Sequence, residues 1–267
     1  MKYSPIYTPV DELNAEVLLR AYANGLFPMA ENSESKHVFW CDPEYRGVMP
    51  IEEFHVPKRL MPRFKNFIKE PDYQILVNKN FEQVMLECAR SVKGREETWI
   101  SQGIIDAYTA LFEKGYAHCL EVWQEDQLIG GIYGVHLGSA FFGESMFSRG
   151  KDGSKIALTH LTARLWAQGF QIFDTQFVNP HIERFGCFEM RKQDYKLRLA
   201  SAVKLRKSML SDFSEKPEIK PKFNLKESFQ KLLKPQNAYS SCVSAWDSFS
   251  SEEELLSKFL QSITQIS

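Results

Sequence analysis

A chain of 267 residues, of which 43% are hydrophobic, is long enough to bury one large core or two smaller ones. Its 33 Lys and Arg residues nearly balance its 34 Asp and Glu residues, which gives a formal net charge of -1. This balance argues against a protein dominated by nonspecific binding to phosphates, although it leaves room for a local basic face.

The cysteines and the N-terminus both favour a cytoplasmic protein. Five cysteines at irregular spacing form no C-x-x-C pair, which argues against a disulfide framework and predicts buried, reduced thiols. The first residues lack the apolar segment of a signal peptide, and no apolar run approaches the length of a membrane span. We therefore expect no membrane partner. The histidines have no metal-ligand spacing, so we also expect no metal site.

The first 100 residues predict a small unit of short helices and strands. Apolar residues at helical spacing begin after Thr8 and end at Asn24-Gly25, where Gly can adopt the left-handed conformation of a helix C-cap. Two short strands are expected between residues 38 and 50, on either side of an Asp-Pro turn. The segments that follow are a basic helix at 58–65, a strand at 73–77 and a helix at 81–89.

The pattern changes near residue 117, where apolar stretches alternate with short polar turns. This spacing is typical of an antiparallel β-meander. A helix then leads to a further strand and to a basic amphipathic helix. The expected elements are a helix at 104–112, strands at 118–123, 128–136 and 141–147, a helix at 154–168, a strand at 170–178 and a helix at 193–209.

The composition shifts again after residue 212. A Pro- and Lys-containing stretch reads as a linker, and a Ser-rich run separates two segments that could form short helices, 223–233 and 252–263. This predicts an appended tail rather than more of the core.

Two carboxylates, Glu144 and Asp174, interrupt apolar strand segments, where an unpaired charge is costly. The helix between the two strands predicts a right-handed crossover that places them side by side and parallel. Gln176 lies two residues after Asp174, on the same face of its strand. The three groups are therefore expected to converge on one cleft. An equally weighted alternative is that Asp174 and Gln176 cap helices or bridge a turn. For Glu144, a structural ion pair with Arg149 is the more ordinary role.

Aromatic, apolar and basic residues each allow two interpretations. Trp40 and Trp99 lie beside polar loops and could stack on a base, although a lone Trp in a strand is usually part of the core. Ile132 and Met146 could line an apolar pocket or simply fill the interior. The two basic helices could contact a nucleic-acid backbone or face solvent.

Ordered blocks between residues 5 and 210 resemble the leucyl/phenylalanyl-tRNA–protein transferases, the bacterial aminoacyltransferases of the N-degron pathway. The most specific blocks are Phe39–Pro50, Leu128–Val135, Gly138–Arg149, with its run Gly143-Glu-Ser-Met-Phe-Ser-Arg149, Phe173-Asp-Thr-Gln176 and His181–Gly186. Chance agreement of so many collinear blocks is not a serious alternative.

The resemblance implies an α+β fold, with a small N-terminal α/β domain followed by an acetyltransferase-like (GNAT) domain that has a mixed central sheet. On this basis we expect an N-terminal domain at 1–100, a catalytic domain at 101–212 and a C-terminal extension at 213–267, partly flexible or helical. It implies no metal or nucleotide cofactor, and we expect a monomer.

The implied activity is transfer of Leu or Phe, with Met as a further candidate, from aminoacyl-tRNA to proteins that begin with Arg or Lys. Asp174 and Gln176 match the family's catalytic positions, and Glu144 matches the carboxylate that binds the acceptor. The resemblance also implies a role for Ile132 and Met146 in the aminoacyl side-chain pocket. Trp99, with Trp40 nearby, matches the aromatic residue beside the terminal adenosine.

This chemistry suits the residue types. The donor ester is already activated, so the enzyme must mainly position the amine and deprotonate it. An α-amine has a pKa near 7.7–8.0, so mild help from a base is enough. We hypothesise that Asp174, acting with Gln176, assists this deprotonation, and that Glu144 provides an anionic subsite for a basic acceptor residue. Ile132 replaces the Met of some relatives, so the ranking of Leu, Phe and Met stays open.

Two departures and two rival functions stay open. Met190-Arg191-Lys192 stands where relatives usually have Ile-Pro-Arg, and the tail after residue 212 is unmatched. An acetyl-CoA-dependent N-acetyltransferase would need a pyrophosphate-binding loop, which the residues after Arg149 match only loosely. A non-catalytic module that binds tRNA or N-degrons would not need the intact pair of Asp174 and Gln176.

Overall fold

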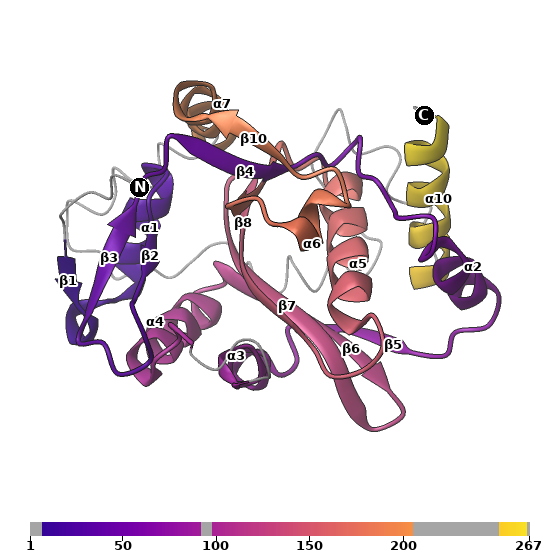
Figure 1. The fold of residues 1–267 in the computed structure, drawn as a ribbon, viewed down its shortest axis with the longest axis horizontal. Coiled ribbons are helices and arrows are strands. Elements are labelled where there is room, and N and C mark those ends of the chain that lie inside the picture. Colours follow the sequence, from indigo (N-terminus) through magenta and orange to yellow (C-terminus); the bar gives the residue numbers. More distant parts are fainter. Residues whose placement is uncertain (1–6, 92–97, 205–250, 266–267) are drawn as a thin grey trace.

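The computed structural model describes residues 7–91, 98–204 and 251–265 of the protein (Figure 1). Its architecture is α+β, with a seven-stranded mixed sheet and a separate three-stranded sheet. The strands are β1 (Tyr7–Pro9), β2 (Phe27–Met29), β3 (His37–Cys41), β4 (Tyr45–Met49), β5 (Gln74–Val77), β6 (Ala117–Gln124), β7 (Gln127–Leu137), β8 (Ala140–Ser148), β9 (Ile172–Gln176) and β10 (Phe188–Arg191). The helices are η1 (Val10–Glu12), α1 (Ala15–Ala23), α2 (Met61–Lys69), α3 (Phe81–Ala89), α4 (Gln102–Glu113), α5 (Gly153–Ala167), α6 (Pro180–Glu183), α7 (Lys192–Lys204) and α10 (Glu252–Gln265).

The large sheet has the strand order β10-β4-β9-β8-β7-β6-β5. Strands β6, β7 and β8 form the predicted antiparallel meander. The crossover through α5 places β9 beside β8, and this pair is parallel, as predicted. Strands β4 and β10 extend the sheet beyond β9 by antiparallel pairing. The α+β class with a mixed central sheet is therefore confirmed.

The large sheet crosses the expected domain boundary at residue 100. Strands β4 and β5 come from before this residue, yet they pair with β9 and β6, which come after it. Strands from both sides of residue 100 thus belong to one sheet. The division into domains at this residue stays a prediction.

Apolar side chains fill two cores, one on each face of the large sheet. Side chains alternate along β7, so that Tyr133 enters the core beneath α1, α3 and α4 while Ile132 enters the core beneath α5. Figure 1 shows these helices on opposite sides of the sheet. We refer to the two cores as the α4 core and the α5 core.

Helix α10 belongs to the α5 core. The prediction of a helix near 252–263 is confirmed, but the prediction that the tail adds nothing to the core is wrong for this segment. One face of α10 is buried against α2 and α5 (Figure 1), and the ring of Phe259 lies 5.7 Å from those of Phe54 and Trp166. The buried residues of this face are Leu256, Phe259, Leu260 and Ile263. The predicted helix at 223–233 lies outside the described residues.

An ion pair fixes the start of α10. Glu252 accepts a hydrogen bond from Arg164 Nη1 at 2.9 Å and contacts His160 Nδ1 at 2.5 Å, and both partners are buried on α5. Burial alone would raise the pKa of Glu252, but Arg164 and His160 lower this pKa to about 2. The carboxylate therefore stays charged beside Arg164 at neutral pH, which anchors the helix to the core.

None of the helices in the described ranges combines the length and the apolar composition of a membrane span.

Replacing Phe259 with Ala tests whether α10 is part of the fold. The ring is 0% exposed, so its loss should leave a cavity and lower the free energy of unfolding by about 3–5 kcal/mol in urea titrations. Gln261→Ala, at an exposed position of the same helix, should change it by no more than about 0.5 kcal/mol. Equal, small effects of the two substitutions would show that α10 does not stabilise the folded protein.

Candidate functional site

Strands β8 and β9 pair only at their beginnings. Their parallel ladder joins Ala140–Phe142 to Ile172–Asp174, whereas the pairing of β9 with β4, on its other edge, continues to Gln176. Glu144 and Gln176 lie two residues beyond the last paired positions of the two strands. We call this place, where β8 and β9 part, the fork. Its position agrees with the predicted convergence of these side chains.

A β-bulge in β8 directs Glu144 into the site. Tyr133 pairs with Ser145 and Gly134 pairs with Gly143, so Glu144 is the extra residue without a partner on β7. The bulge places two successive side chains, those of Glu144 and Ser145, toward the α4 core. A regular strand would have sent one of them to the opposite face.

Neutral donors hold the Glu144 carboxylate. Tyr22 and Gln176 donate to its Oε1 at 2.6 and 3.0 Å, and Tyr108 donates to Oε2 at 3.1 Å. The hydroxyl groups of Tyr22 and Tyr108 are themselves 2.5 Å apart. Burial raises the pKa of Glu144 to about 7, and these hydrogen bonds, which favour the charged form, oppose that rise. The group can therefore exchange a proton near neutral pH.

Asp174 forms a buried ion pair with Arg46. Arg46 Nε lies 2.9 Å from Asp174 Oδ1, and its Nη2 lies 2.9 Å from Oδ2. Tyr195 on α7 donates to Oδ2 at 2.5 Å. The guanidinium group also lies 4.5 and 4.6 Å from the ring centroids of Phe27 and Tyr195, and it donates to the Gly25 carbonyl at 3.0 Å. These contacts tie β9 to β4, α7 and the end of α1.

Gln176 connects the two carboxylates. Its backbone N–H donates to Asp174 Oδ1 at 2.8 Å, while its side-chain Nε2 donates to Glu144 Oε1. Its φ of 66° is unusual for a residue other than Gly, and such conformations persist only where surrounding contacts impose them. The hydrogen bond from Gln176 N to Asp174 Oδ1 bridges a local turn. Asp174 and Gln176 therefore do both things that the sequence allowed: they bridge a turn, and they converge with Glu144.

Four residues of this network were not identified from the sequence: Arg46, Tyr195, Tyr22 and Tyr108. Arg46 lies inside a strand that is otherwise largely buried, and a charged residue in such a strand is a usable signal. The tyrosines gave no signal, because a Tyr at helical spacing reads as an apolar residue. The predicted ion pair of Arg149 with Glu144 is wrong, since Arg149 Nε contacts Glu87 Oε2 at 2.5 Å.

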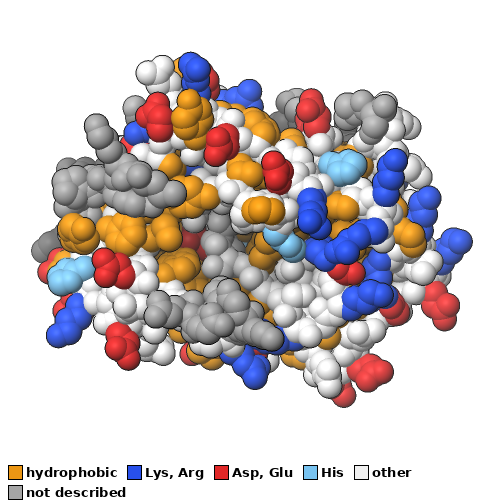
Figure 2. Space-filling view, in the orientation of Figure 1, with side chains coloured by type: hydrophobic (Ala, Val, Ile, Leu, Met, Phe, Trp, Pro, Cys, Tyr) orange, Lys and Arg blue, Asp and Glu red, His pale blue; other side chains and the backbone are white. Residues whose placement is uncertain are grey.

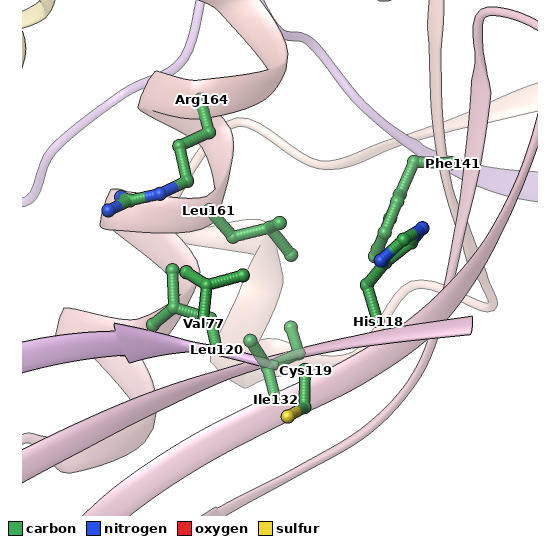
Figure 3. Close-up of a pocket in the computed structure, with 8 residues that line it drawn as sticks. All are labelled: Val77, His118, Cys119, Leu120, Ile132, Phe141, Leu161 and Arg164. Atoms are coloured by element: carbon green, nitrogen blue, oxygen red, sulfur yellow. The ribbon is translucent and has the colours of Figure 1, made fainter. Parts of the chain in front are cut away.

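Ile132 and Met146 face the α5 core, on the other face of the sheet from Glu144. They pair directly across β7 and β8. Ile132 lines a narrow pocket between the sheet and α5 that is too small to hold a water molecule, and Met146, its partly exposed neighbour across the strands, packs against the same core. Figure 3 shows Leu161 of α5 pointing toward the strands, with the guanidinium group of Arg164 directed away from it. The pocket is lined by Val77, His118, Cys119, Leu120, Ile132, Phe141, Leu161 and Arg164.

The two tryptophans differ in exposure. Trp40 is 4% exposed within the α4 core, and its Nε1 donates to Thr8 Oγ1 at 3.0 Å. Trp99 is partly exposed and packs against the same core. Trp99 therefore has a free surface that Trp40 lacks.

Lys and Arg side chains gather on one side of the molecule, where Figure 1 places α2 (Figure 2). Arg59, Arg184 and Lys155 lie close enough to His181 to lower the pKa of its imidazole, together with its burial, which is the larger cause. We call these three residues, with the exposed Lys58 and Lys65, the basic patch.

Replacing Arg46 should show how much the free energy of unfolding depends on pairing the buried Asp174 carboxylate. Arg46→Met leaves Asp174 without its counter-charge and should lower the free energy of unfolding by about 3–5 kcal/mol. The matched control is Arg20→Met, because Arg20 pairs with Glu16 in solvent, and it should cost no more than about 1 kcal/mol. Urea unfolding of both variants makes the comparison, and similar losses would contradict a structural role for the Arg46–Asp174 pair.

The raised pKa of Glu144 makes a second prediction. Between about pH 4.5 and pH 7 the folded state binds this proton more tightly than the unfolded state, so the contribution of Glu144 to stability falls as pH rises. Glu144→Gln removes this dependence. Relative to the wild type, the variant should gain about 2–3 kcal/mol between pH 5 and pH 8 in urea unfolding. Glu113→Gln, at an exposed site on α4, is the control, and parallel curves for all three proteins would refute the raised pKa.

Two family models match this chain. The family model described as leucyl/phenylalanyl-tRNA protein transferase matches residues 48–200, and the model of the N-terminal domain of that family matches residues 11–44. A leucyl/phenylalanyl-tRNA–protein transferase of Paramagnetospirillum magneticum is 48% identical over 191 residues, which cover 72% of this chain and 90% of that protein.

Two further relatives carry the same name. The protein of Maricaulis maris is 46% identical over 204 residues, covering 76% of this chain and 91% of its own length. That of Ruegeria sp. is 46% identical over 207 residues, covering 78% and 95%. The fork and the strands that build it lie within the residues that the family models match. The chain therefore belongs to the leucyl/phenylalanyl-tRNA–protein transferase family.

Proposed function

We propose that this aminoacyltransferase moves Leu or Phe, with Met as a third candidate donor, from aminoacyl-tRNA to the α-amine of proteins that begin with Arg or Lys. In this role it marks those proteins for the N-degron pathway, as a monomer in the cytoplasm. The observation that carries the proposal is the chain of hydrogen bonds Glu144–Gln176–Asp174 at the fork, in a member of this family.

Asp174 and Gln176 form the proposed catalytic pair. Asp174 is 0% exposed, so it acts through Gln176, whose backbone it holds in place. Gln176 in turn presents its amide beside Glu144. Glu144 is the proposed binding group for the acceptor, because it is the partly exposed carboxylate of this network. The acceptor is cationic, and an anionic group at the site attracts it.

The donor is proposed to approach from the other face of the sheet. Ile132 and Met146 lie there, and we assign them to the aminoacyl side-chain pocket. Beyond Phe142 and Asp174, β8 and β9 no longer pair with each other. An ester held at the fork on the α5 side of the sheet can therefore meet an amine that comes from the α4 side. Its side chain then rests against the α5 side. A pocket wall of Ile132 discriminates only modestly between donors that differ by a methyl group.

The nucleotide end and the acceptor stem need further contacts. Trp99 is the proposed partner of the terminal adenosine, because its partly exposed indole can stack on a base, and Trp40, the second aromatic residue assigned to this site, is buried in the same core. The basic patch is the proposed contact for the phosphates of the tRNA. Such contacts position the tRNA without reading its sequence.

We also propose that the fold is acetyltransferase-like (GNAT). The antiparallel meander, the crossover helix α5 and the parallel but parting pair of β8 and β9 support this assignment. The division into an N-terminal domain at 1–100, a catalytic domain at 101–212 and an extension at 213–267 is kept with it.

Use of acetyl-CoA is disfavoured by the turn after β8. The backbone N–H groups of Arg149 and Gly150 both donate to the Ile129 carbonyl, at 2.8 and 2.9 Å. The N–H of Ser154 donates to the Ser148 hydroxyl at 3.3 Å. A pyrophosphate site needs such groups unoccupied. A non-catalytic module is disfavoured by the satisfied network around Asp174.

One assay tests the activity. Leu-tRNA and a peptide that begins with Arg should yield a peptide with an added N-terminal Leu, detected by mass spectrometry. Asp174→Ala should lower the rate at least about 10²-fold because Gln176 loses its anchor. Asp126→Ala, on the exposed turn between β6 and β7, is the control and should keep the wild-type rate. Acetylation in place of leucylation, or near-normal transfer by a folded Asp174→Ala variant, would overturn these assignments.

A further inference from the structure

Only one of the two carboxylates at the fork is open to a substrate. Asp174 is 0% exposed, and both of its oxygens accept hydrogen bonds from neighbouring groups. An amine could reach it only by displacing Arg46 or Tyr195. Glu144 is partly exposed, and among the described residues its Oε2 accepts a hydrogen bond from Tyr108 alone. A carboxylate oxygen can accept two, so Oε2 keeps the capacity to accept a further hydrogen bond from an N–H donor.

No positively charged side chain among the described groups that face Glu144 holds it in the charged form, so its charge depends on whether it is protonated. No Lys or Arg within the described ranges forms an ion pair with it, and Arg46 pairs with Asp174. The facing groups are Tyr22 from α1, Tyr108 from α4, Tyr133 from β7, and Gln176 and Asp174 from β9. The phenols and the amide are neutral, and Asp174 adds a negative charge.

We infer that Glu144 is the base that takes the proton from the acceptor's α-ammonium group, with Gln176 as the positioning residue that holds the carboxylate. This inference deepens the proposed function and rests on it. It gives the contact of Glu144 with the acceptor a chemical role beyond attraction of a positive charge.

The protons and bonds of the step balance. The ammonium group gives one N–H proton to Glu144 and becomes a neutral amine. Its lone pair then attacks the ester carbonyl, forming the N–C bond while the C–O bond to the ribose breaks. The attacking nitrogen loses a second proton, which goes to the departing ribose oxygen. Glu144 returns its own proton to solvent before the next turnover.

The acidity of Glu144 supports this role. Burial raises the pKa of this carboxyl to about 7, which is close to that of an α-amine. Proton transfer is most effective when the pKa values of the base and the acid lie near each other and near the working pH. The Glu144 carboxylate therefore meets the requirement that an ordinary surface carboxylate, with a lower pKa, would miss.

Single-turnover transfer to a peptide that begins with Arg, measured from pH 6 to pH 9, tests the inference. At pH 7, Glu144→Gln should be slower than the wild type by about 10²-fold. At pH 9 the amine, whose pKa lies near 7.7–8.0, is already neutral, so the deficit should shrink by up to about tenfold. A second peptide keeps the Arg side chain but carries an aminooxy group in place of the N-terminal α-amine. This group is unprotonated at pH 7, so the deficit of Glu144→Gln should also be smaller with this peptide. Asp126→Asn serves as the matched carboxylate-to-amide control and should follow the wild type throughout.

Tyr108→Phe gives an independent readout if Glu144→Gln folds poorly. Loss of this donor removes a hydrogen bond that favours the charged carboxylate. The acid limb of the rate profile should therefore move to higher pH by about one unit. A purely structural role of Tyr108 would lower the rate without moving this limb.

The outcomes separate the inference from the function on which it rests. A Glu144→Gln deficit that is the same at every pH and with both acceptors would show that Glu144 binds the acceptor but takes no proton. An unmoved acid limb in Tyr108→Phe would do the same. Absence of transfer by the wild type at any pH would instead refute the proposed function, and the inference with it.

Discussion

The buried ion pair between Arg46 and Asp174 is the interaction on which the site depends. Removing two charges from water is costly, and such a pair persists only when its geometry is good and its remaining donors and acceptors are satisfied. Here Tyr195, the Gly25 carbonyl and the Gln176 N–H complete the set. Since Asp174 holds Gln176 and Gln176, with Tyr22 and Tyr108, holds Glu144, the position of the partly exposed carboxylate depends on a charge pair that is itself out of reach of substrate.

Much of this arrangement was accessible from the sequence. Glu144 and Asp174 were identifiable because each is a charge in an apolar strand, and the helix between the strands predicted their parallel pairing. The pairing partners were not accessible, because they depend on strand neighbours that are distant in sequence: Arg46 lies 128 residues before Asp174, and Tyr22 lies 122 residues before Glu144. The bulge at Glu144 was also invisible, since a local pattern cannot show which residue lacks a cross-strand partner.

Helix α10 shows a different limit of sequence reading. Its apolar spacing predicted a helix, but the low-complexity stretch before it suggested a detached tail. What places α10 in the core is a long-range match between Glu252 and the buried Arg164, together with the ring of Phe259. This helix lies outside the residues matched by the family models, so the chain adds a packed element to the part that those models match. The helix packs against α5, which also lines the pocket of Ile132.

The central claim is that donor and acceptor meet at the fork between β8 and β9. The most direct measurement is a crystal structure of the protein with an adenosine that carries leucine through a stable amide in place of the ester. The account predicts the leucine side chain against Ile132 and Met146, with the amide carbonyl within hydrogen-bonding distance of the Gln176 side chain. An analogue bound away from the fork, with Glu144 and Gln176 contacting neither the amide nor the leucine, would contradict it.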